Sequence, residues 1–253
     1  MNNRIFTGCI LFLLLAVPVH GTGDKKEQSA GDQTPAITTK GNVTDDSAAD
    51  FKSRAKKKAG KGDLANNQLD YKKAADFYKK AADLIEPLPD SKLTLARYLQ
   101  KQGNACRDAG LYAEAEKPLK RSLEIREKHL KKDHEDVAAV LDNLADLYLL
   151  QGRYEEAEPL YKRSLAAREK SLGPEHSDIA QSLGGLAELY RKQGRNKEAE
   201  PLYKRSLAIN EKNLGPDHPS VALLLNNLAG LYHAQGRYKE AGPLYKRISG
   251  LWR

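Results

Sequence analysis

Three histidines have the most regular spacing among the residues that could do chemistry. His134, His176 and His218 recur every 42 residues, each in a polar segment between apolar stretches. Imidazole is a common metal ligand, but a metal site needs ligands that converge on one point. A fixed spacing of this length is typical of helix pairs that stack one on the next. Equivalent residues of two stacked pairs lie roughly 20 Å apart, the width of one pair. We therefore expect these histidines to cap helices or brace loops, and we expect no metal or other cofactor.

Other patterns that could support catalysis are weak. Ser53-Arg54-Ala55-Lys56 matches the Ser-x-x-Lys of penicillin-recognising enzymes, but the sequence holds nothing else of that set. It has no Gly-rich phosphate loop, no His-Glu-x-x-His and no Gly-x-Ser-x-Gly. Cys9 lies in an apolar N-terminal run, and Cys106 falls where a small core residue is expected. The sequence therefore predicts that the protein is not an enzyme.

The residues that must position any site belong to a tandem repeat. Gln151–Lys192 aligns with Gln193–Ala234 without gaps, with 26 identities in 42 positions. Further copies begin near Leu69, near Gly110 and at Gln235. A fixed period of this kind indicates one supersecondary unit copied in tandem. Stacked repeats form an extended surface and not a closed pocket, which again disfavours an enzyme.

Each unit reads as two antiparallel helices. The apolar residues of the first helix recur at helical spacing, as do those of the second. Gln151-Gly152-Arg153 predicts a tight turn in which Gly152 takes the left-handed conformation. Leu172–Asp178 is the longer connection to the next unit, and its Pro, Ser and Asp predict a helix stop and an N-cap. The apolar stripe of one first helix comprises Val137, Val140, Leu141, Leu144, Leu147 and Tyr148.

This pattern resembles the tetratricopeptide repeat (TPR) in its 42-residue, kinesin-light-chain-like form. The motif residues of one copy are Ala145, Tyr148, Gly152, Ala157 and Tyr161, and they recur in the next two copies. An earlier copy departs, because Cys106 and Leu119 replace the two tyrosines. The resemblance implies an all-α, right-handed α-solenoid of antiparallel helix pairs that binds proteins or peptides.

Four prolines recur in the predicted second helices. Pro118, Pro159, Pro201 and Pro243 each fall a short way inside the helix. A proline near the first turn loses at most one backbone hydrogen bond, so its repetition predicts a mild, regular bend. The alternative is that each second helix begins after its proline.

The N-terminal region predicts two segments outside the array. Residues 1–21 read as a signal peptide, with Arg4 followed by the apolar run Ile5–Val17 and small residues near Gly21. Residues 22–50 hold too few large apolar side chains to fold and predict a disordered linker. Residues 51–253 form the TPR array of about five helix pairs, the first degenerate and the last truncated. We expect export to the periplasm or cell exterior, and an uncleaved membrane tether is the alternative.

The chain is basic, with a formal net charge of +8. Part of the excess lies in Phe51–Gly62, which holds six cations and no acid. Such a run suits nucleic acid or an anionic membrane surface, but a solvated face on a degenerate first helix is the preferred interpretation. Elsewhere acids and bases alternate, so we expect no nucleic-acid partner, and we expect no stable membrane span in the mature chain.

The resemblance also implies where a ligand binds, because TPR first helices line an inner groove. Asn143 and Asn227 match groove asparagines that hydrogen-bond a peptide backbone, whereas Lys101 and Gly185 interrupt this row. The N-terminal end of the groove is basic and predicts a ligand segment that bears acids. The candidate residues are Arg97, Lys101, Asn104, Arg107, Asp142, Asn143, Asp146, Gln181, Glu188, Arg191, Asn226, Asn227 and His233.

Two functions of different classes follow from the sequence. The first is an exported scaffold or adaptor that binds a protein or peptide through the groove. The second is a structural spacer that self-associates through its C-terminal repeat, where the chain departs from the repeat pattern after Arg247. A native cap and a truncated array both fit that departure.

Overall fold

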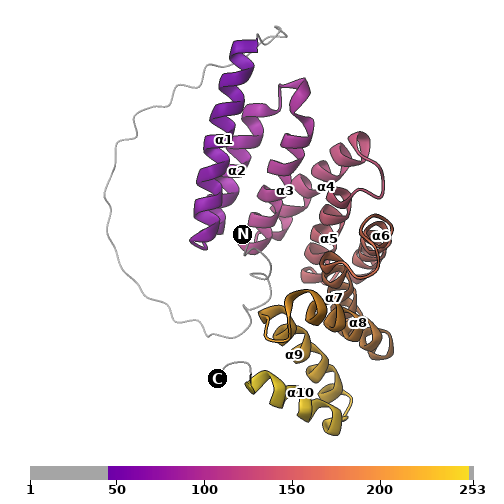
Figure 1. Ribbon diagram of the computed structural model, residues 1–253. Helices are drawn as coiled ribbons and strands as arrows, with labels where there is room; N and C mark the ends of the chain where they lie inside the picture. The colour runs from indigo at the N-terminus through magenta and orange to yellow at the C-terminus, as the bar shows by residue number, and fades with distance from the viewer. Residues whose placement is uncertain (1–44, 251–253) are drawn as a thin grey trace, which may run out of the picture.

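The computed structural model describes residues 45–250, with side chains from residue 47 onward. Within this range the chain forms α-helices, one short 3₁₀ helix at Pro89–Ser91 and no strand (Figure 1). The all-α solenoid predicted from the sequence is confirmed. The predicted signal peptide, most of the predicted linker and Trp252 lie outside the described residues. The helices are α1 (Asp45–Asn67), α2 (Tyr71–Ile85), α3 (Lys92–Asp108), α4 (Tyr112–His129), α5 (Glu135–Leu150), α6 (Tyr154–Leu172), α7 (Ser177–Lys192), α8 (Asn196–Leu214), α9 (Pro219–Ala234) and α10 (Tyr238–Gly250).

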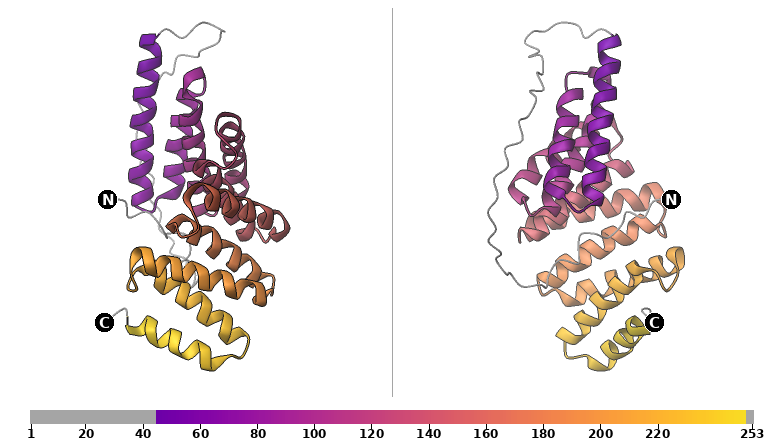
Figure 2. Two further views of the ribbon diagram at one scale, coloured as in Figure 1. Left: turned by 45° about the vertical axis from the view of Figure 1, so that its right-hand side comes forward. Right: turned by 90° about the vertical axis from the view of Figure 1, so that its left-hand side faces the viewer.

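Consecutive helices pack as pairs, and the pairs stack in chain order into a twisted array (Figure 2). In each pair an odd-numbered first helix precedes an even-numbered second helix. The first helices α3, α5, α7 and α9 also contact one another in sequence. The helix α1 forms one end of the array, and it begins at Asp45, inside the segment that was predicted to be linker.

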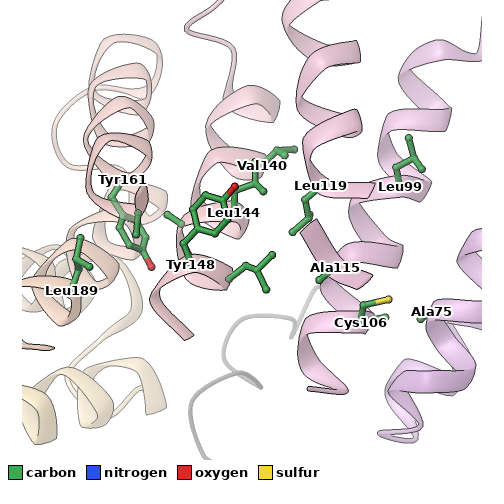
Figure 3. Close-up of a cluster of buried hydrophobic side chains, with 14 of the residues drawn as sticks. Ala75, Leu99, Cys106, Ala115, Leu119, Val140, Leu144, Tyr148, Tyr161 and Leu189 are labelled. Atoms are coloured by element: carbon green, nitrogen blue, oxygen red, sulfur yellow. The ribbon is translucent and has the colours of Figure 1, made fainter. Parts of the chain in front are cut away.

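The apolar stripes predicted from helical spacing form the core. All six predicted residues of α5, from Val137 to Tyr148, are buried. Figure 3 shows how neighbouring pairs share these side chains, with Leu119, Leu144, Tyr148 and Tyr161 between successive helices. Cys106 is also buried here, and burial raises the pKa of its thiol to about 11. A thiol that is protonated at neutral pH fits the predicted core role.

Glycine closes the turn between the two helices of most pairs. Gly152 has φ +73°, as predicted, and Gly110, Gly194 and Gly236 have similar values. The first pair differs, because Leu69 occupies this position with φ 61°. The same backbone hydrogen bond closes both kinds of turn: Asp70 donates to Ala65 over 2.9 Å, as Arg153 donates to Tyr148 over 2.8 Å. Leu69 therefore holds a conformation that disfavours a side chain.

The three recurring histidines cap the first helices. Each precedes a first helix, and its Nδ1 accepts a hydrogen bond from the backbone N–H two residues later. The distances are 3.1 Å for His134, 3.2 Å for His176 and 3.1 Å for His218. The capping role predicted for the histidines is confirmed. The prediction that Ser177 or Asp178 would cap α7 is wrong, because both already lie inside the helix.

All four recurring prolines lie inside second helices. Helix α6 begins at Tyr154, ahead of Pro159, and the other second helices begin in the same way before Pro118, Pro201 and Pro243. The alternative that each helix starts after its proline is therefore wrong. Each proline lies just beyond the first turn, so each of these helices lacks one internal backbone hydrogen bond there.

A repeated polar contact joins successive pairs. In its first copy Glu116 of α4 accepts hydrogen bonds from Tyr148 of α5, over 3.0 Å, and from Arg153 of the next turn, over 2.7 Å. The Arg153 guanidinium also lies 4.0 Å from the centre of the Tyr148 ring, and it bonds Glu156. We call this group the inter-pair latch. Its other copies are Glu158 with Tyr190 and Arg195, and Glu200 with Tyr232 and Arg237.

The latch holds its acids ionised. Hydrogen bonds from Arg237, together with those from Lys204 and Tyr232, bring the pKa of Glu200 to about 2 against the opposing effect of desolvation. The hydrogen bond from Arg153 likewise lowers the pKa of Glu116, to about 2. A charged acceptor strengthens each bond, so the latch stabilises the orientation of one pair on the next. No latch joins α2 to α3, because Cys106 and Leu111 replace the tyrosine and the arginine.

Leu69→Gly should stabilise the protein. A side chain in the left-handed region costs about 1–2 kcal/mol, and the greater freedom of unfolded glycine offsets part of this gain. We expect the free energy of unfolding to rise by about 1 kcal/mol, measured by urea denaturation. The converse Gly152→Leu should lower it by a similar amount. A destabilised Leu69→Gly would mean that Leu69 makes packing contacts that outweigh its strain.

The latch predicts a specific acid sensitivity. A lowered carboxyl pKa contributes stability that is complete above the unfolded value of 4.5 and is lost as pH falls towards 2. Glu200→Gln should lower the free energy of unfolding at neutral pH by about 1 kcal/mol, since solvent screens the pair. The variant should also lose less stability than the parental chain between pH 4.5 and 2. Glu155→Gln, at an exposed position on α6, is the control, and identical pH profiles for all three proteins would refute the role of the latch.

Candidate functional site

Polar side chains lie along the successive first helices, and we call this set of residues the inner face. Most of its members are exposed or half-buried. Arg97 and Gln181 are exposed, whereas Asn104, Arg107 and Asp146 are half-buried. The remaining members are Asp63, Lys101, Asn143, Glu188, Arg191 and Asn227.

Two of the three cations predicted to bind an acidic ligand, Lys101 and Arg107, already have partners. The Lys101 ammonium lies 2.7 Å from an oxygen of Asp63 on α1. Arg107 lies 3.0 Å from Asp108 and 3.4 Å from Asp146 of α5, and only 14% of its side chain is exposed. Both cations therefore join neighbouring helices. A ligand carboxylate must compete with Asp63 or Asp146 for them.

Arg191 is also satisfied within the chain. Its guanidinium donates two hydrogen bonds to Glu188, one turn earlier on α7, over 2.7 and 2.6 Å. These bonds raise the pKa of Arg191 above its ordinary value. The inner face therefore carries paired charges and few free ones, and the amides Gln181 and Asn227 contribute neutral hydrogen-bonding groups.

A tyrosine–acid pair recurs behind this surface and was missed by the sequence interpretation. Tyr78 donates to Asp63 over 2.8 Å, Tyr161 to Asp146 over 2.5 Å, and Tyr203 to Glu188 over 2.7 Å. In each case the acid lies on a first helix and the tyrosine lies 15 residues later on the second helix. That constant spacing is the signal that would have revealed the pair.

Two copies of this pair are incomplete. In the last helix pair, Gly230 stands at the acid position, 15 residues before Tyr245. In the second helix pair both members differ. Asn104 stands at the acid position of the second helix pair, and Leu119 stands 15 residues later in place of the tyrosine. The Asn104 side-chain oxygen is buried and has no hydrogen-bond partner among the described residues. An unsatisfied buried oxygen is costly, so the broken pair lowers the stability of this part of the array, and the buried atom itself does not reach the surface.

The structure explains why glycine interrupts the asparagine row. A Cβ atom at Gly185 would lie 2.5 Å from Cε1 of Tyr161 and 2.9 Å from Cζ. Tyr161 thus occupies the volume that an asparagine at this position would need. Asn143 itself is 9% exposed, so only part of its amide reaches the inner face, while Asn227 is half-buried.

Asp142 does not belong to the inner face. It is 2% exposed, lies 2.8 Å from Arg168 of α6 and accepts a hydrogen bond from Ser182 of α7 over 3.0 Å. Burial raises the pKa of Asp142 to about 6 although the arginine opposes this. Its predicted groove role is therefore wrong. Asn226 occupies the same repeat position and is exposed, so its role in binding stays a prediction.

The Ser-x-x-Lys pattern lies on the exposed surface of a helix. Ser53 and Lys56 are both exposed on α1. The described residues contain no group of three or more His, Cys, Asp or Glu side chains that could hold a metal. Among the described helices, none is long and apolar enough to cross a membrane.

Gly185→Ala should disturb the inner face by a steric effect. The new methyl group would displace the Tyr161 ring and weaken its hydrogen bond to Asp146, with a cost of about 1–3 kcal/mol for overpacking. Chemical denaturation measures this change in the free energy of unfolding. Gly60→Ala on α1 is the matched control, because its Cβ meets nothing within 4 Å. An equal effect of both substitutions would argue against the clash with Tyr161.

Comparisons with known proteins agree with this geometry. The tetratricopeptide repeat family matches residues 55–128, 136–212 and 178–252. No curated protein matches the chain as a relative. Three solved structures of similar architecture are each less than 25% identical to the chain, so they show the fold alone.

The first similar structure comes from Podosopora anserina and is described as a kinesin light chain with nearly identical TPR-like repeats. It is 24% identical, with 79% of this chain and 95% of that chain covered and a TM-score of 0.68. BtubC (BKLC) from P. vanneervenii is 20% identical, with 81% and 88% covered and a TM-score of 0.68. A Rap protein complexed with Competence and Sporulation Factor is 19% identical, with 82% and 59% covered and a TM-score of 0.66. Since the family matches most of the chain, the protein belongs to the tetratricopeptide repeat family.

Proposed function

We propose that the protein is an exported scaffold or adaptor that binds a protein or peptide through its inner face and has no catalytic activity. The observation that carries this proposal is the row of polar side chains along the five first helices, which suits an extended ligand. TPR proteins are typically scaffolds, and a Rap protein of similar fold was solved in complex with another factor. Export to the periplasm or cell exterior rests on the signal-like residues 1–21.

The inner face supports recognition of a backbone as well as of charge. Asn143, Asn227 and Gln181 offer amide donors and acceptors. Arg97 is exposed and has no ion-pair partner among the described residues, whereas Lys101 is paired. An acidic segment is therefore proposed to contact Arg97 first and to reach Lys101 only by displacing Asp63.

Self-association through the C-terminal pair is the alternative. Tyr245 favours it, because this side chain is 41% exposed whereas the equivalent Tyr203 is buried. Two features oppose a head-to-tail contact between two chains that would copy the contact between successive helix pairs within one chain. Gly242 replaces the latch acid, and α1 carries Arg54 and Lys57 at positions where other first helices bury apolar side chains. Burying these charges without acids would be costly, so groove binding is preferred.

The test uses the purified chain as bait in envelope and secreted fractions of the source organism. We expect a saturable partner whose affinity falls about thirtyfold in Asn143→Ala/Asn227→Ala, since each of the two lost hydrogen bonds costs about 1 kcal/mol. Asn196→Ala, on the second-helix layer, should leave the affinity unchanged. Thermal unfolding of each variant separates lost contacts from lost structure.

Two results would contradict the proposal. Equal retention of the partner by all three proteins would place the interface away from the inner face. Recovery of only the chain itself, with concentration-dependent size in sedimentation, would instead favour self-association.

A further inference from the structure

The turn between α1 and α2 exposes two leucines beside several lysines. Leu64 is 58% exposed and Leu69 is 61% exposed, at the end of α1 and in the turn that follows. Lys57 and Lys61 precede them on α1, and Lys72 and Lys73 follow at the start of α2, all exposed. We call these six residues the first-hairpin tip.

Leu69 is the most unusual residue of the tip. Every later turn between paired helices has glycine at this position, with φ from 72° to 75°. Among the described non-glycine residues, only Leu69 adopts the left-handed conformation. The strained conformation contributes little packing inside the chain, because most of the Leu69 side chain is exposed to water. A strained and exposed apolar residue points to a contact outside the chain.

The charges around the leucines are mostly of one sign. None of the four lysines has an ion-pair partner among the described residues, and Lys61 lies 5.9 Å from the centre of the Phe77 ring. Two acids are close by. Asp63 is already bonded to Lys101 and Tyr78, while Asp70 is exposed and accepts a hydrogen bond from the backbone N–H of Lys73. The tip therefore presents a net positive charge beside an apolar surface.

We propose that the first-hairpin tip binds the surface of an anionic phospholipid bilayer. In this arrangement Leu64 and Leu69 enter the boundary between headgroups and acyl chains, and the lysines contact headgroup phosphates. Nucleic acid would match the lysines but offers no apolar phase for the leucines. A stable protein interface buries about 1,200 Å² or more, which is large for a tip with two leucines.

Vesicle sedimentation of the full chain tests the proposal. We expect binding to phosphatidylcholine vesicles to increase when phosphatidylglycerol is included, and to weaken at high salt. Leu69→Gly should weaken the binding about tenfold through lost apolar burial. Lys57→Gln/Lys61→Gln/Lys72→Gln/Lys73→Gln should weaken it by about tenfold or more, since each cation contributes to attraction by anionic lipid.

Matched controls separate the tip from the rest of the chain. Lys128→Gln/Lys131→Gln/Lys132→Gln removes three exposed lysines, one in the last turn of α4 and two in the connection to α5, and should leave binding unchanged. The apolar run Ile5–Val17 is present in every variant, so it cannot cause a difference in vesicle binding between them. Because Leu69→Gly should also raise stability, weaker binding by this variant cannot come from unfolding.

A local reporter gives a second readout. Leu69→Trp should show a blue-shifted emission with phosphatidylglycerol vesicles, whereas Leu150→Trp, at another exposed leucine, should not; Trp252 is common to both. Equal vesicle binding by the parental chain and both tip variants would overturn the proposal. So would an unchanged emission at position 69 while the protein remains bound. Saturable capture of a soluble acidic protein by the tip, without any lipid effect, would assign the surface to a protein partner instead.

Discussion

Each helix pair before the last described one is completed by the first helix of the pair that follows. Tyr161 illustrates the constraint, because its ring is 1% exposed, its hydroxyl bonds Asp146 of the same pair, and Gly185 of the next pair leaves room for it. The size of one residue is thus tied to the absence of a side chain on another helix. Stability then depends on neighbouring contacts repeated along the stack.

This constraint also shapes the inner face. The latches place their charges in the turns and along the second helices, while Lys101 and Arg107 join neighbouring first helices by pairing with Asp63 and Asp146. The same cations cannot hold the stack together and remain free for a ligand. The stack therefore leaves mainly amides available, which favours recognition of a peptide backbone over recognition of charge alone.

Helical periodicity and the 42-residue period were enough to predict the helix pairs, the buried stripe of α5, the left-handed Gly152 and the capping histidines. These features depend on local spacing, which one chain displays directly. The tyrosine–acid pairs and the buried Asp142–Arg168 contact depend on which side chains face each other across helices. Asp142 looked like a groove residue because the helical repeat places it beside Asn143, and only the packing of α6 and α7 shows that it is covered.

The first helix pair shows how departures from a repeat can be interpreted physically. At one end of a stack, a face that internal pairs bury must be made polar, and Arg54 and Lys57 do this on α1. That requirement explains polarity, but acids would serve it as well as bases. The repeat pattern separately predicts a glycine at the turn after α1, because the later turns all have glycine there and glycine takes the left-handed conformation without strain. Leu69 violates this expectation and adds apolar surface where a cap should remove it. The cap therefore accounts for the charges along α1, whereas the leucine at the turn requires a surface outside the chain.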